Sequence, residues 1–269
     1  MILDKQLEGA STGVSGPSMS KPRTVSVIMP AYNAQRYLTS AIASVQTQTY
    51  PHWELIVIDD ASRDTTLELA RELAAADSRI RVLNQPVNKG VAEARNLGLD
   101  HATGELIAFL DSDDLWFPEK LSRQIGFMTG SGALVSYTAY QRMDESGRVM
   151  GVVRPPVKLT YAKLLRSNFI GNLTGVYDAK TLGKQYLTEF KHEDYVAWLS
   201  LVKKAGVALG MNEVLASYRV YSGSTSSNKL KTSAWQWRIY RESQGLGRWY
   251  SAWLMACYAG HAMTKRLSK

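Results

Sequence analysis

The sequence contains one cysteine and no long hydrophobic run. Cys257 cannot form a disulfide within the chain, which is typical of a reducing compartment, and we expect it to be a packing residue. No segment reaches the roughly 18 consecutive apolar residues of a membrane-spanning helix. Residues 1–22 lack the apolar core of a signal peptide and are expected to form a flexible leader. These absences predict a cytoplasmic protein, either free or peripheral on the inner face of the cell membrane.

Acidic residues are scarce near the end of the sequence. Between residues 229 and 269, eight Lys or Arg stand against one acid, Glu242, so this segment carries +7 of the net charge of +8. Residues 1–228 are therefore close to neutral. A basic segment indicates an anionic partner, which is either a nucleic acid or a membrane surface. The chain of 269 residues, 45% of them hydrophobic, is long enough to bury one substantial core.

The sequence alternates between short β-branched runs and segments of helical periodicity. Strands are expected at 25–29, 54–58, 80–84 and 105–110, and helices at 38–45, from about 64, and at 90–102. These strands are continuously apolar, which is typical of a parallel sheet that is buried on both faces. Beyond residue 118 the order is mixed, with helices expected at 118–128, 160–167 and 194–205 and strands at 132–140, 148–153 and 214–221. The pattern predicts an α/β fold with a mostly parallel sheet flanked by helices.

Polar residues follow the expected strands at their carboxyl ends. They are Asn33, Asp59, Asp60, Asn88, Asp111, Asp113 and Asp114. In an open α/β sheet, ligands bind beyond these strand ends. Several carboxylates in one crevice repel one another unless a cation or hydrogen-bond donors neutralise them. The sequence therefore predicts a divalent ion, Mn²⁺ or Mg²⁺, because such cations take carboxylate and phosphate oxygens together.

The acidic run at 111–114 has two interpretations. Alternate residues of an extended segment point to the same side, so Asp111 and Asp113 can face one ion. Alternatively, Asp111 and Ser112 cap the helix that follows. The position of the run directly after an apolar strand, with Asp59 and Asp60 expected nearby, favours the metal site.

Four blocks of the sequence resemble glycosyltransferase family 2. They are VSVIMPAYNAQRYL, ELIVIDDASRDTT, NKGVAEARNLGL and GELIAFLDSDDLWFPEKL, in this order and spacing. The similarity is close over 25–125 and looser up to about 225. It implies the GT-A fold and transfer of a sugar from a nucleotide-sugar donor to an acceptor hydroxyl with inversion. It also implies a catalytic domain at 23–228, with a nucleotide-binding half at 23–117 and an acceptor half at 118–228.

The resemblance implies a set of donor-binding residues for a UDP-sugar. Pro30 and Tyr32 would lie against the nucleobase, and Asp60 would accept from the uracil imide. Arg95, with Lys89 as the second choice, would approach the base or the phosphates. The DxD element corresponds to Asp111, Ser112 and Asp113: Asp113 is the expected metal ligand, with Asp114 as the alternative, and Asp111 would lie nearer the ribose.

Two acids, Glu193 and Asp194, precede the apolar stripe of the helix expected at 194–205. The helix dipole favours ionised carboxylates at this end, so either acid can serve as a base. Acids at helix starts also serve simply as caps. The block resembles the family's ED motif, which implies that Asp194 is the base and that Glu193 orients the acceptor or supports Asp194. We expect the adjacent His192 to be an ordinary polar residue.

One family feature is missing from the sequence. Where some relatives have a histidine metal ligand after Tyr-Arg, this chain has Tyr221. A third protein ligand to the metal is therefore not implied. We expect Arg219 or the serine-rich loop at 222–228 to cover the donor diphosphate instead.

The segment 229–269 interleaves its cations with tryptophans and tyrosines and is expected to form a helical appendage. This composition suits an anionic membrane surface, although packing of a helical hairpin against the main domain is the alternative. The segment and the stretch YRVYSGSTSSNK also resemble the family's bacterial branch that builds teichuronic-acid-type and O-antigen polysaccharides. That resemblance implies a saccharide acceptor on a polyprenyl diphosphate.

Two other function classes are disfavoured by the sequence. A metal-dependent nucleotidyltransferase would need a glycine-rich phosphate loop after the first strand, and PAYNAQRYL contains no glycine. A nucleic-acid-binding protein would spread positive charge over a domain face, whereas here the main domain is nearly neutral and its expected crevice is acidic. We therefore expect no nucleic-acid partner.

Overall fold

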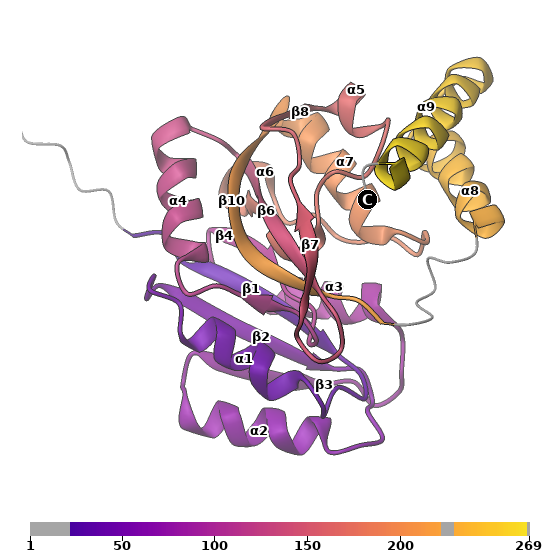
Figure 1. Cartoon of the computed structure of the whole chain (residues 1–269). Helices are drawn as coiled ribbons and strands as arrows, with labels where there is room; N and C mark the ends of the chain where they lie inside the picture. Colours follow the sequence, from indigo (N-terminus) through magenta and orange to yellow (C-terminus); the bar gives the residue numbers. More distant parts are fainter. Residues whose placement is uncertain (1–21, 222–228, 268–269) are drawn as a thin grey trace, which may run out of the picture.

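The computed structural model describes residues 22–221 and 229–267. The expected leader, apart from Pro22, and the serine-rich loop at 222–228 lie outside the described residues. Figure 1 shows a central sheet with helices on both faces and a pair of helices, α8 and α9, at one side. Among the described residues, no helix is both long enough and apolar enough to cross a bilayer.

The elements follow the expected alternation in the first half of the chain. The strands are β1 (Val25–Ala31), β2 (Trp53–Asp59), β3 (Ile80–Asn84), β4 (Leu106–Phe109), β5 (Leu115–Trp116), β6 (Val135–Met143), β7 (Val149–Val153), β8 (Lys158–Thr160), β9 (Val176–Asp178) and β10 (Val207–Arg219). The helices are α1 (Leu38–Gln46), α2 (Thr66–Ala76), α3 (Val91–His101), α4 (Lys120–Ser131), α5 (Tyr161–Leu164), α6 (Ala179–Leu182), α7 (Glu193–Ala205), α8 (Lys229–Arg238) and α9 (Arg248–Leu267). A 3₁₀ turn, η1, spans Asn172–Thr174, and a π-helix, η3, spans Ile239–Ser243.

The sheet is mixed but mostly parallel, as the sequence predicts. Its order is β3-β2-β1-β4-β9-β6-β10-β5, and β1, β2, β3 and β4 are parallel to one another. β9 runs antiparallel between β4 and β6, whereas β10 is parallel to β6. The carboxyl ends of β1, β2 and β4 therefore meet at one edge, where the polar residues that follow them come together.

Strand β1 is buried on both faces, which explains its continuous apolar sequence. Val27 and Met29 point into a cluster with the apolar residues of α1 and α4. Ile28, between them, points into a second cluster with residues of α3 and α7. Side chains alternate across a strand, so one strand supplies both cores of this three-layer molecule.

The second half departs from the expected elements where they are short or irregular. β10 begins at Val207, before the expected start at 214, because α7 ends at Gly206 with φ 77° and the chain pairs at once with β8 and β6. The helix expected at 160–167 is only the single turn α5, which Thr160 caps by accepting from the Lys163 amide. β5, β8, β9 and α6 contain two to four residues each, too few to produce a periodic signal.

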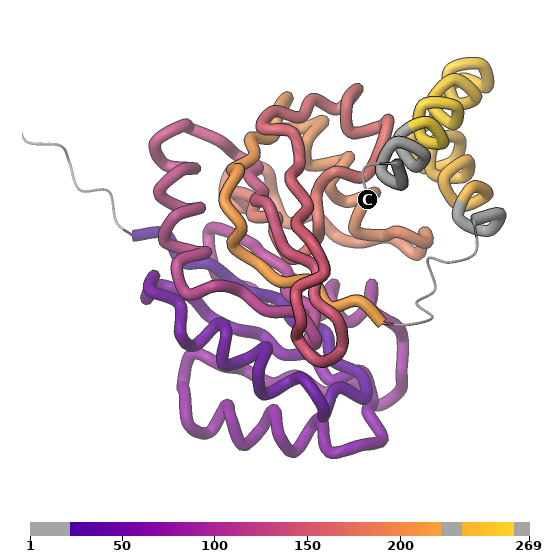
Figure 2. Tube along the Cα trace, in the orientation of Figure 1, coloured from indigo at the N-terminus to yellow at the C-terminus, as the bar shows by residue number. Residues whose placement is uncertain are grey.

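The C-terminal helices pack partly against the main domain, next to the turn that precedes α7 (Figure 2). Ile239, Tyr240 and Leu254 are fully buried in the same cluster as residues of α7. The Tyr240 hydroxyl donates to the Leu165 carbonyl at 2.6 Å. In contrast, Trp249 is 91% exposed. One face of the C-terminal helices therefore packs against the main domain, and the opposite face is exposed to solvent.

Candidate active site

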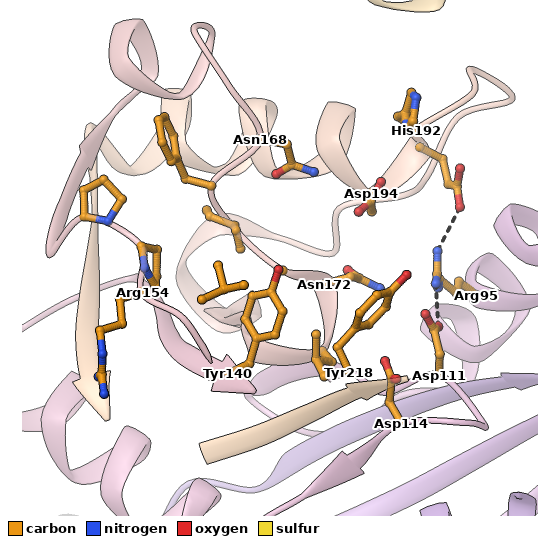
Figure 3. A pocket seen from close by; sticks show the side chains of 18 residues that line it. Arg95, Asp111, Asp114, Tyr140, Arg154, Asn168, Asn172, His192, Asp194 and Tyr218 are labelled. Atoms are coloured by element: carbon orange, nitrogen blue, oxygen red, sulfur yellow. Dashed lines mark hydrogen bonds and ion pairs between the residues drawn. The ribbon is translucent and has the colours of Figure 1, made fainter. Parts of the chain in front are cut away.

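Two cavities lie beyond the carboxyl ends of the strands, and Asp111 lines both. The small cavity, about 400 Å³, is lined by six of the predicted site residues: Pro30, Tyr32, Asp60, Asp111, Ser112 and Asp113. The large cavity, about 840 Å³ (Figure 3), is lined by Arg95, Asp111, Asp114, Glu193 and Asp194. Lys89 is exposed and lines neither cavity. The structure thus brings the predicted donor-binding, metal and catalytic residues, except Lys89, to two adjoining cavities.

Asp60 fixes the turn at the start of α3. Its carboxylate accepts from the backbone amides of Lys89 at 2.8 Å and Gly90 at 2.7 Å, and from the Gln85 side chain at 3.2 Å. Gly90 has φ 90°, a conformation that favours glycine. Lys89 thus contributes its backbone amide to this turn. Asp60 is buried at the base of the small cavity and holds one of its walls in place.

Arg95 connects the acidic run after β4 to the start of α7. Its side chain is almost fully buried, and its guanidinium donates to Asp111 at 2.6 Å and to Glu193 at 3.0 Å. Asp111 follows β4, whereas Glu193 begins α7. Such charge-assisted bonds are strong and directional, so Arg95 sets the position of α7 relative to the acidic run (Figure 3). The sequence predicts Arg95 as a site residue but gives no signal for this bridge.

The acidic run holds more negative charge than its neighbours neutralise. Burial raises the pKa of Asp113, and the Asp111 carboxylate raises it further. Burial raises the pKa of Asp114 well above its ordinary value, with the neighbouring carboxylates adding to the effect. One oxygen of Asp114 accepts from the Arg219 amide at 2.8 Å, and the other is buried without a partner among the described residues.

These carboxylates fit a divalent cation that has further ligands from a substrate. An unpaired buried carboxylate oxygen beside two other acids is the environment that a cation stabilises. The described residues contain no group of three His, Cys, Asp or Glu side chains placed to hold an ion by themselves. A metal at this position would therefore complete its coordination with oxygens of the donor and with water.

Arg219 and Tyr221 support the acidic run from the end of β10. The Tyr221 hydroxyl donates to Asp113 at 2.8 Å. Arg219 is buried; its guanidinium donates to the Asp113 carbonyl at 2.9 Å and lies 4.0 Å from the centre of the Tyr37 ring. Arg219 lines neither cavity, and its contacts hold the loop that carries Asp113. The serine-rich loop, the other expected cover of the diphosphate, lies outside the described residues.

The helix α7 begins at Glu193, so both predicted acids lie in its first turn. Glu193 is paired with Arg95, whereas Asp194 forms no ion pair with any residue that the structure describes. Burial raises the pKa of Asp194, the Arg95 charge lowers it, and Glu193 raises it again. The two acids are therefore in different environments: Glu193 is bound to Arg95, whereas Asp194 lines the large cavity without an ion pair among the described residues.

His192 precedes these acids in the left-handed conformation, with φ 62° and ψ 46°. Its ring packs against Trp235 of α8, with centroids 5.7 Å apart. It lines the large cavity but belongs to no metal-binding group among the described residues. The appendage therefore touches the turn that carries Glu193 and Asp194.

The sequence profile of Glycosyl transferase family 2 matches residues 26–187, more than half of the chain. The chain belongs to this family. The glycosyltransferase is 40% identical over 245 residues to TuaG of Bacillus subtilis (strain 168), which is assigned to teichuronic acid biosynthesis; the match covers 90% of this chain and 97% of TuaG. It is 42% identical over 217 residues to WfgD of Escherichia coli, a UDP-Glc:alpha-D-GlcNAc-diphosphoundecaprenol beta-1,3-glucosyltransferase, covering 80% and 84% of the two chains.

The fold of this glycosyltransferase is also that of solved GT-A enzymes. The mannosyltransferase PcManGT of Pyrobaculum calidifontis, solved with GDP-Man and Mn²⁺, superposes with a TM-score of 0.67 over 93% of this chain and 77% of its own. At 15% identity this likeness concerns the fold alone. The predicted family, the GT-A fold and the glycosyltransferase activity are thereby confirmed.

Proposed function

We propose that this glycosyltransferase moves a sugar from a UDP-sugar, with inversion, to a hydroxyl of a saccharide on a polyprenyl diphosphate, in bacterial surface polysaccharide synthesis. The observation that carries this proposal is the adjacency of two cavities at Asp111, one with the predicted nucleotide residues and one with Asp194. A donor in the small cavity would place its anomeric carbon toward an acceptor in the large one. Inversion requires this arrangement, because the acceptor oxygen must attack directly.

The donor half of the proposal rests on the small cavity. Tyr32 is 45% exposed and so offers a face for stacking a nucleobase, with Pro30 and Asp60 beside it. The E. coli relative takes UDP-Glc according to its name. Uracil presents an imide N–H, and Asp60 lies on this wall as an acceptor. These features favour a uridine nucleotide.

We infer that Asp113 holds Mn²⁺ or Mg²⁺, with Asp111 or Asp114 as its neighbour. When bound, the ion neutralises the charge that develops on the leaving diphosphate. Asp194 takes the proton from the acceptor hydroxyl while that oxygen bonds to the anomeric carbon and the nucleoside diphosphate leaves. Arg95 holds Glu193, and through it the first turn of α7, so that Asp194 keeps its position.

A diphosphate-linked acceptor also fits the far wall of the large cavity. Arg154 lies across this cavity from Arg95 (Figure 3). Its guanidinium donates to the backbone and side-chain oxygens of Asn212, both neutral, and pairs with no carboxylate in the described part of the chain. An exposed, uncompensated arginine at the cavity rim suits phosphate oxygens. The WfgD acceptor named above is a diphosphoundecaprenol glycoside.

The open face of the C-terminal helices favours contact with an anionic membrane. Trp249, Tyr250 and Trp253 are exposed, and the last two stack with ring centroids 5.6 Å apart. The Arg166 guanidinium lies 5.2 Å from the centre of the Trp253 ring. Aromatic rings with adjacent cations bind at the headgroup boundary. Such binding would bring the large cavity near a membrane-held acceptor.

Replacing Trp249 and Trp253 with serine should weaken binding to anionic vesicles by about tenfold or more, because large apolar side chains lose their contact with lipid. High salt should weaken the parent's binding only in part, since screening affects the charge component alone. Vesicle sedimentation measures both. Tyr186→Ser is the control, because Tyr186 is similarly exposed, at 46%, elsewhere on the domain. If the parent and the double variant sediment equally with the vesicles, the C-terminal helices only pack against the main domain and do not bind the membrane.

Point substitutions are preferable to truncation here. Removing everything from Lys229 would also take Ile239, Tyr240 and Leu254 out of the core. Loss of such side chains costs about 2–5 kcal/mol each, so a truncated protein would lose stability as well as the membrane surface.

A donor screen tests the proposed function directly. The purified protein is incubated with sugar nucleotides and Mn²⁺, and the released nucleoside diphosphate is measured. Release from a UDP-sugar supports the proposal. Release of pyrophosphate from nucleoside triphosphates, without sugar transfer, would instead indicate a nucleotidyltransferase.

Asp60→Ala should weaken binding of free UDP as well as of the UDP-sugar, which calorimetry measures. Stability should also fall, by about 1–3 kcal/mol, because the Lys89 and Gly90 amides lose their acceptor. Glu54→Ala is the matched control: its carboxylate accepts from the Thr103 and Gly104 amides but lines neither cavity. It should lose stability and keep UDP affinity. Equal UDP affinities for parent and Asp60→Ala would remove Asp60 from the site.

A further inference from the structure

We propose that Asn172 and Asn168 bind hydroxyl groups of the acceptor sugar in the large cavity, and that Trp198 determines which atom of Asn172 faces that sugar. The inference rests on the proposed function, because it takes the large cavity as the acceptor site. It adds the residues that select the acceptor, which the motifs of the family do not include.

The first observation is a pair of unsatisfied amide atoms on the cavity wall. Asn172 Nδ2 and Asn168 Oδ1 are both buried and have no hydrogen-bond partner among the described residues. Both residues line the large cavity together with Asp194. Buried polar groups are rarely left unpaired, because each loses its bonds to water on burial. An unpaired donor and an unpaired acceptor on one wall therefore indicate a polar ligand.

The second observation is that the orientation of Asn172 is fixed. Trp198 Nε1 donates to Asn172 Oδ1 at 3.3 Å. An indole nitrogen can only donate, so it must face the amide oxygen, and the amino group is then the unpaired end of this side chain. Trp198 is itself held, since it is 1% exposed and packs edge-on against Phe109 and Tyr177.

The backbone of this segment is held equally firmly. A Cβ atom at Gly175 would lie 2.2 Å from the Trp198 ring, so only glycine allows this approach. Trp116, just after the acidic run, donates from its indole nitrogen to the Leu173 carbonyl at 2.7 Å. The turn η1 is thereby bound both to α7 and to the segment that follows the acidic run. A binding group that is fixed before the ligand arrives loses little entropy on binding.

The remaining wall fits a sugar ring. Tyr140 and Tyr218 lie edge to face, with centroids 6.2 Å apart, and Figure 3 shows Asn172 between them in this view, with Asn168 and Asp194 above. Aromatic faces suit the apolar C–H face of a pyranose. A sugar hydroxyl both donates and accepts, so it can satisfy an amino group and an amide oxygen in turn. The ligand class is thus a neutral pyranoside with free hydroxyls, next to the Asp194 carboxylate.

The test uses a panel of short-chain alkyl diphosphate glycosides of glucose, galactose and their N-acetyl forms. For the best acceptor of the wild-type enzyme, Asn172→Ala and Asn172→Asp should raise the acceptor KM by about 10- to 100-fold. UDP affinity should stay near that of the parent for both variants. Thermal stability should fall for Asn172→Ala, because the buried Trp198 Nε1 loses its acceptor, and should fall less for Asn172→Asp, which keeps an acceptor at this position. Asn84→Asp, which makes the same charge change outside both cavities, is the control.

Monodeoxy forms of that acceptor identify the contact. The deoxy form that lacks the hydroxyl bound by Asn172 should be a poor acceptor for the wild type, yet no poorer than its parent sugar for Asn172→Ala. Trp198→Phe removes the indole donor and keeps an aromatic ring. It should therefore raise the acceptor KM and reduce the differences in KM between the deoxy forms.

The outcomes separate the two proposals. A wild-type enzyme that transfers to no member of the panel contradicts the proposed function. An active wild type whose Asn172 variants keep the acceptor KM and the same ranking of deoxy forms overturns the inference alone. In that case a water molecule, and no ligand, satisfies the amides.

Discussion

Asp194→Asn is expected to lower sugar transfer by about 10²- to 10⁴-fold, the usual range for loss of a general base, without unfolding the protein. Asparagine keeps the size of the side chain and much of its capping capacity but cannot take a proton. UDP affinity should be unchanged, because Asp194 lines the large cavity and not the small one. Single-turnover transfer and calorimetry with UDP measure the two quantities.

Glu193→Gln is the matched control, one position away in the same helical turn. It weakens the ion pair with Arg95 but leaves the Asp194 carboxylate in place, so its loss of transfer should be smaller. If Asp194 were only a cap, Asp194→Asn would keep nearly normal turnover, and the loss would appear in stability, by about 0.5–2 kcal/mol for the alanine variant. Near-normal transfer by both variants would leave the proposed mechanism without its base.

The raised pKa of Asp194 gives this prediction a pH dependence. A base acts in its ionised form, so transfer should fall as the pH drops through a pKa above the ordinary value of an aspartate. The same shift means that the ionised form is less favourable in the folded than in the unfolded state. That destabilisation is present above the raised pKa and disappears as the pH falls through it. Asp194→Asn should therefore not lose stability at neutral pH.

Asp113→Ala is expected to lower turnover by about 10²-fold or more while the protein stays folded, because the metal loses its main protein ligand. Chelation should abolish the parent's activity, and Mn²⁺ or Mg²⁺ should restore it. Manganese binding in the presence of UDP, followed by electron paramagnetic resonance, reports the ion independently of turnover. It should be lost in Asp113→Ala.

Two neighbouring variants make this result specific. Tyr221→Phe removes the hydroxyl that donates to Asp113 but no carboxylate, so manganese binding should persist. Asp114→Asn tests the alternative ligand. If Asp114 held the ion, Asp114→Asn would lose more manganese binding than Asp113→Ala. Full activity of the parent in chelator would remove the metal from the mechanism.

The parts of this protein that the sequence predicted are those set by local patterns. A continuous apolar run predicts a buried strand wherever it occurs, and β1, β2, β3 and β4 overlap the expected segments closely. The carboxyl ends of parallel strands meet at one edge, so the sequence alone predicts that Asp60 and Asp111 lie in one crevice. Short elements such as β5, β8 and β9 were missed, because two or three residues contain no period.

Sequence by itself determined the family, the α/β class and most residues of the small cavity, because these depend on motifs and on the order of strands. Only the tertiary structure decided how the two cavities adjoin at Asp111, that Glu193 rather than Asp194 pairs with Arg95, and which face of the C-terminal helices is exposed. Arg95 and Glu193 are separated by 98 positions, and Trp198 reaches Asn172 across 26. Such contacts depend on how helices pack on a sheet, and no local pattern of residue types encodes that distance.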